Sequence, residues 1–104
     1  NHDDLMAVVS HLPQLTSNAL ALVLKRAGLS RELLGSGGRD MTRLAGSDRG
    51  MWEDLLEAAP KALPESLRNL EAALAQLRAL LEAGRTDEIG DRMEETRRWL
   101  GDEA

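Results

Sequence analysis

The stretch "LPESLRNLEAALAQLRALL" (Leu63 to Leu81) decides the fold class of this sequence. Its leucines recur in alternating steps of four and three, at positions 63, 67, 70, 74, 77 and 81. This period of 3.5 residues is typical of a helix that packs along its whole length against another helix. Pro60 or Pro64 can stand in its first turn, and Gly84 can end it. We therefore expect one long helix, from Pro60 or Pro64 to Ala83.

The segment before this helix also has a helical pattern. Apolar residues recur at helical spacing from Asp3 to Ala27, and Gly28 is placed to stop that helix. Pro13 lies inside it and predicts a kink, because proline lacks the N–H that would bond to Val9.

The remaining segments are shorter. We expect a helical turn over 30–34, a short helix over 39–45, a further helix after residue 48, and a last one starting at Thr86. We expect "GSGG" (Gly35 to Gly38) to be irregular, because glycine loses much conformational freedom on ordering. Since no segment has the pattern of a strand, the prediction is an all-α domain of about five helices.

Composition limits the possible functions. The 104 residues suffice for one domain, with 42% hydrophobic and 30% charged residues. The net charge of −5 argues against a general nucleic-acid binder. The absence of cysteine excludes disulfides and fits a cytoplasmic protein. The apolar runs are expected to be too short to span a membrane. Because Asn1 almost immediately enters a helical pattern, we expect the chain to be part of a longer protein.

Catalysis by this chain alone has little support. His2 and His11 are the two histidines, and His11 adjoins Ser10, whose side chain cannot face it on a helix. His2, Asp3 and Asp4 do not have the spacing of a metal site, so we expect no metal.

A cationic segment is the candidate binding site. Arg39 and Arg43 are four residues apart and share one face of a helix, and a guanidinium matches the geometry of a carboxylate or phosphate. Two interpretations stay open at this point. The arginines either bind an anion, with Asp40 bracing one of them, or simply bridge neighbouring acids such as Glu53 and Asp54.

Two ordered motifs give the sequence a family resemblance. "HDDLMAVVSHLPQL" (His2 to Leu15) and "GSGGRDMTRLAGSDRGMW" (Gly35 to Trp52) resemble the C-terminal helical domain of prephenate dehydrogenases. The resemblance covers residues 1–104. It implies a dimerisation domain like the C-terminal domain of 6-phosphogluconate dehydrogenase, which binds substrate and forms a homodimer through leucine-rich helices. The Rossmann domain that binds NAD or NADP would precede it and is absent from this chain.

The resemblance also implies an activity. Such enzymes oxidise and decarboxylate prephenate, or the related arogenate, in tyrosine biosynthesis, and tyrosine can inhibit them. This chain would bind the substrate carboxylate and dimerise without being active alone. Two other interpretations stay open: a stand-alone helical interaction module, and a sensor of aromatic acids. We expect neither nucleic acid nor a membrane as a partner.

The resemblance also implies roles for individual residues, according to the motif positions that they match. Arg43 matches the arginine that binds a substrate carboxylate, and His11, Gln14 and Trp52 match or adjoin positions that face the substrate. Asp40, Arg39 and Thr42 would support this segment. No residue of this chain is expected to be catalytic or to bind the cofactor.

The sequence departs from the family pattern at two of these positions. Gln14 replaces a histidine that is usual in the family, and glutamine cannot become cationic. Gly38 replaces a usual phenylalanine. The replacement at Gln14 puts substrate preference and tyrosine inhibition in doubt.

Overall fold

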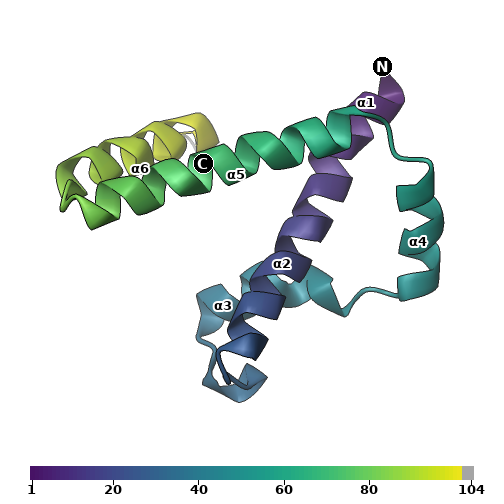
Figure 1. Ribbon diagram of the computed structural model, residues 1–104, viewed down its shortest axis with the longest axis horizontal. Coiled ribbons are helices and arrows are strands. Elements are labelled where there is room, and N and C mark those ends of the chain that lie inside the picture. The colour runs from purple at the N-terminus through teal and green to yellow at the C-terminus, as the bar shows by residue number, and fades with distance from the viewer. Residues whose placement is uncertain (102–104) are drawn as a thin grey trace. The chain divides into compact units, whose positions relative to one another are not determined.

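The computed structural model describes residues 1–101, and that part contains helices and no strands, which confirms the all-α prediction. Figure 1 shows the helices in chain order. The elements are α1 (His2–Met6), η1 (Ala7–His11), α2 (Leu12–Arg26), η2 (Arg31–Leu33), α3 (Ser36–Thr42), η3 (Arg43–Gly46), α4 (Arg49–Glu57), α5 (Ala62–Glu82) and α6 (Thr86–Leu100). Because α1, η1 and α2 run on without a break, and α3 runs directly into η3, the described part has five main helical segments, as expected, and the separate 3₁₀ turn η2.

The chain forms two compact units, Asn1–Leu67 and the part from Arg68 onward, and α5 contributes residues to both. In the first unit, α2 contacts η1, α3 and η3. Figure 1 shows α3 beside α2. In the second unit, α6 runs back along α5 (Figure 1). The candidate site residues all lie in the first unit, so α2 is the element that organises them.

Next to Pro13, where the sequence predicts a kink, the helix contains a π-helical turn. The N–H of Leu12 donates to the carbonyl oxygen of Ala7, five residues earlier, and this wide turn directly precedes the proline. A π-turn of this kind interrupts the regular bonding of an α-helix and often occurs at functional sites. His11 therefore lies where the helix changes its winding.

Glycines end both long helices as the sequence indicates. Gly28 has φ +84° and Gly84 has φ +71°, in the left-handed region that favours glycine. After α5, the N–H of Arg85 donates to Leu80 O (2.8 Å) and that of Gly84 to Leu81 O (3.1 Å), the two bonds of a Schellman motif. Each glycine reverses the chain at a defined point.

The expectation for "GSGG" was wrong, because residues 36–38 form the first turn of α3. The N–H of Arg39 donates to Gly35 O (3.0 Å), and the Thr42 hydroxyl donates to Gly38 O (2.7 Å). These bonds compensate for the poor helix propensity of glycine. The helix thus starts earlier than the expected Arg39 and becomes a 3₁₀ turn at Arg43.

The expectation about membrane-spanning length also needs correction. The continuous helix His2–Arg26 has 25 residues and is long and apolar enough to cross a membrane, judged by length and composition. The core helix of a soluble protein or a signal sequence meets the same criteria. Length and composition therefore do not identify this helix as a membrane span.

Little apolar surface is buried within the chain. Among residues 1–101, the buried apolar side chains are those of Ala7 and Leu63. Many large apolar side chains are exposed instead; on α1, η1 and α2 they are Leu5, Val8, Val9, Leu22 and Val23, and on α5 they are Leu74, Leu77 and Leu81. The leucine seam of α5 is thus buried at its start and exposed along its second half.

Leu63 should carry an unusually large share of the stability of this domain, because it is 3% exposed in a chain with few buried apolar residues. We expect Leu63→Ala to lower the free energy of unfolding by about 2–5 kcal/mol, measured by urea denaturation. Leu33, which is 70% exposed on η2, provides the control. An equal loss from Leu33→Ala would contradict this assignment of the core.

Candidate functional site

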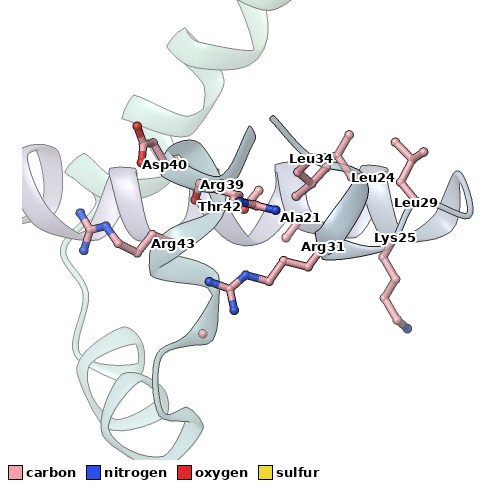
Figure 2. A pocket seen from close by; sticks show the side chains of 11 residues that line it. Ala21, Leu24, Lys25, Leu29, Arg31, Leu34, Arg39, Asp40, Thr42 and Arg43 are labelled. Carbon is pink, nitrogen blue, oxygen red and sulfur yellow. Dashed lines mark hydrogen bonds between the residues drawn. The ribbon is translucent and has the colours of Figure 1, made fainter. Parts of the chain in front are cut away.

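A large hollow of the first unit has a volume of about 550 Å³ and is lined by residues from the end of α2 and from the segment η2–α3–η3. Its apolar floor consists of Ala21, Leu24, Leu29 and Leu34. Its charged lining consists of Lys25, Arg31, Arg39, Arg43 and one acid, Asp40 (Figure 2). The hollow therefore offers an apolar surface with an excess of positive charge, in a protein whose net charge is −5.

Among residues 1–101, the four cationic side chains that line this hollow form no ion pair with an acid. Within residues 1–101, the side-chain ion pairs involve other arginines, such as Arg49 with Glu53 (2.8 Å) and Arg78 with Glu82 (2.9 Å). Arg39 and Arg43 have no such partner there, although Asp40 lies beside them. Of the two interpretations of the cationic segment, the bridging of neighbouring acids finds no support in the described residues.

Gln14 is the centre of a second group of predicted residues. It is 4% exposed, and its Nε2 donates to Leu44 O (2.7 Å) and to Asn18 Oδ1 (3.1 Å). The Ser47 hydroxyl, which has one proton, lies 3.2 Å from Gln14 Oε1 and 2.7 Å from Leu44 O. Both amide protons of Gln14 are thus engaged, and the side chain connects α2 to η3.

His11 and Trp52 are also close together. Their ring centroids are 5.5 Å apart with an interplanar angle of 89°, an edge-to-face arrangement. His11 Nδ1 is buried and has no hydrogen-bond partner among residues 1–101. The ring is therefore held by Trp52 and retains the capacity for one more hydrogen bond.

The predicted site residues form two groups separated by η3. Thr42, Arg39, Asp40 and Arg43 line the large hollow, whereas Gln14 and Trp52 line a smaller one of about 260 Å³, together with Asn18 and Ser47. Arg43 and Gln14 share no hollow, but Leu44 follows Arg43 directly and accepts the hydrogen bond of Gln14. The two groups are thus joined through the backbone of η3.

Glu32 lies beside Arg31 and Arg39, two of the arginines that line the large hollow. Hydrogen bonds from its own backbone N–H and from Ser30, with a smaller effect of Arg31, hold the pKa of the Glu32 carboxyl below its usual value. This carboxylate therefore stays ionised at neutral pH. Within residues 1–101, no cluster of histidine and acidic side chains is placed to hold a metal ion.

Sequence reasoning missed four residues of these two groups. Asn18 lies four residues after Gln14, so the helical period placed it on the same face, and this signal could have been used. Ser47 had no comparable signal. Lys25 and Arg31 reach the hollow because the chain reverses at Gly28, and their side-chain positions do not follow from spacing.

Comparison with known proteins identifies the family. The family described as "Prephenate dehydrogenase, dimerization domain" matches residues 1–95, so the chain belongs to this family. A prephenate dehydrogenase of Lactococcus lactis subsp. cremoris (strain MG1363) is 30% identical over 80 residues. That match covers 73% of this chain and 23% of the relative, so the chain corresponds to about a quarter of the length of the protein it matches.

The edge-to-face pair of His11 and Trp52 can be tested by a double-mutant cycle. We expect His11→Ala and Trp52→Ala to show a coupling energy of about 0.5–1.5 kcal/mol in urea denaturation, the value of an aromatic pair beyond its buried area. Met51 neighbours Trp52 on α4 and is exposed, so His11→Ala with Met51→Ala should be additive. Additivity of the first pair would show that the rings do not interact.

Proposed function

We propose that this chain is the substrate-binding and dimerising domain of a dehydrogenase that acts on prephenate or arogenate. The observation that carries the proposal is Arg43, which stands in the family motif and lines a cationic hollow without an acidic partner among residues 1–101. A guanidinium can bind a carboxylate through two parallel hydrogen bonds. The apolar side chains that line the same hollow suit the ring of an aromatic precursor.

The reaction divides between two domains in this proposal. NAD or NADP, bound by a Rossmann domain elsewhere in the protein, would accept the hydride, and the substrate would lose its ring carboxyl group as CO₂ to give 4-hydroxyphenylpyruvate from prephenate. The residues of this chain bind and orient the substrate. Arg43 holds a carboxylate, whereas Trp52, which packs against His11, lines the smaller hollow beyond η3. We expect no turnover from this chain alone, because the hydride acceptor lies on the other domain.

Replacement of Arg43 tests the carboxylate site in the complete enzyme. We expect Arg43→Ala to raise KM for prephenate about ten- to a hundredfold, because losing a charged hydrogen-bonding partner costs roughly 1.5–3 kcal/mol. KM for the nicotinamide cofactor should stay unchanged, since that site lies on the other domain. The measurement is initial-rate kinetics with each substrate varied in turn.

Arg26 provides a matched control, because it is an exposed arginine on α2 that does not line the hollow. Arg26→Ala should leave both KM values unchanged. An unchanged KM for prephenate in Arg43→Ala would contradict the carboxylate site. It would favour instead the interpretation of the chain as a helical interaction module.

We also propose a homodimer formed through the leucine-rich helices. Leu74 is 57% exposed and Leu81 is 66% exposed, although both belong to the heptad seam of α5. Leu77 and Leu81 of α5, with Ile89 and Met93 of α6, line an apolar hollow of about 330 Å³ within the second unit. A second copy of the chain could fill this hollow and cover the exposed leucines.

Charged substitutions in the seam test the dimer. We expect Leu70→Asp combined with Leu74→Asp to give monomers, because a carboxylate without a partner is costly to bury in an interface. Size-exclusion chromatography with multi-angle light scattering gives the mass. As a control with the same charge change, Ala75→Asp with Gln76→Asp lies beside the seam and should remain dimeric. A dimer in the seam variant would mean that these leucines pack within one chain.

A further inference from the structure

We infer that Gln14 is a positioning residue that acts on the ligand through Arg43 and does not contact the ligand itself. The inference rests on the proposed carboxylate site and assigns a different role to Gln14 than its place in the family motif implies. Its starting point is the burial of the side chain, which is 4% exposed. A side chain buried to this degree contacts the surrounding protein on nearly every side.

The hydrogen bonds of Gln14 determine how its amide is oriented. The Leu44 carbonyl oxygen, 2.7 Å away, can only accept a hydrogen bond, so the amide nitrogen of Gln14 must face it. The second amide proton goes to Asn18 Oδ1 at 3.1 Å. Because both donors are used inside the protein, Gln14 has no N–H to offer to a ligand.

The hydrogen bond to Leu44 restrains the backbone next to Arg43, the residue that carries the positive charge. Leu44 is the second residue of η3, and Arg43 is the first. A 3₁₀ turn of four residues has few internal hydrogen bonds, so an added bond from α2 restricts its backbone position. Arg43 is one of the residues that line the large hollow, and Figure 2 shows its guanidinium on the side away from Leu24 and Leu29. Gln14 and Ser47, which both bond to Leu44 O, therefore fix the place from which Arg43 reaches the ligand.

A glutamine suits this role better than the histidine usual at this position. The glutamine amide can donate two hydrogen bonds from one nitrogen, to Leu44 and to Asn18 at once. Each imidazole nitrogen carries at most one proton, so a histidine could not donate both bonds from the same atom. The replacement thus exchanges a titratable side chain for one that fixes η3 at all pH values.

A double-mutant cycle distinguishes positioning from direct contact. The dissociation constant for prephenate is measured by isothermal titration calorimetry on the complete protein, in the native and the Arg43→Ala backgrounds. We expect Gln14→Met, which keeps the length of the side chain and removes its hydrogen bonds, to weaken binding about tenfold in the native background. In the Arg43→Ala background the same substitution should change the dissociation constant less than twofold.

Two further variants make the test robust. Ser47→Ala removes an exposed hydroxyl from the same carbonyl oxygen and should reproduce the pattern with a smaller effect, even if Gln14→Met does not fold. Gln76→Met on α5 is the control, because Gln76 is an exposed glutamine far along the chain, and it should change nothing.

The outcomes separate the inference from the proposed function. Equal weakening by Gln14→Met in both backgrounds would show that Gln14 acts independently of Arg43, and would overturn the inference while leaving the carboxylate site intact. Unchanged binding in Gln14→Met would overturn it as well. If Arg43→Ala itself does not weaken binding, the carboxylate site is wrong, and the positioning role falls with it.

Discussion

The shortage of buried apolar surface is the constraint on which this structure depends. Within residues 1–101, only Ala7 and Leu63 are buried apolar side chains, and the chain has neither Phe nor Tyr to add bulk. A domain of this size normally needs a substantial apolar core to offset the conformational entropy lost on folding. The leucines and valines that would normally form such a core are exposed on α2 and α5. The core that the described residues bury by themselves is therefore small.

This shortage explains why polar contacts are prominent at the candidate site. The short elements α3 and η3 bury no residue of their own, yet they carry Arg39 and Arg43, two of the four cationic side chains of the large hollow. Their position depends on the bonds of Gln14 and Ser47 to Leu44, and on the Thr42 hydroxyl bond to Gly38. Such bonds are directional, so they fix a backbone position more specifically than apolar packing of equal energy. A site built in this way can be precise although the core beneath it is small.

The sequence predicted the helices better than the contacts between them. The spacing of apolar residues and the glycines after each helix predicted the extents of α2 and α5. Both signals depend only on residues close together in the chain. The start of α3 was misjudged, since glycine propensity was overridden by the Thr42 and Arg39 bonds to Gly38 and Gly35. The contacts of Gln14 with Leu44 and Ser47 could not be predicted from the sequence, because these residues follow it by 30 and 33 positions. The resemblance identified Arg43 and Gln14 as site positions, whereas only the structure separates them into two groups.

The continuous helix of residues 2–26 supports the candidate site through hydrogen bonds and also exposes apolar side chains. On its inner face, Gln14 and Asn18 hold η3, while Val9 and Val23 are exposed to the outside. Because Gln14 bonds to Leu44, this helix helps to set the backbone position of η3 and thus of Arg43.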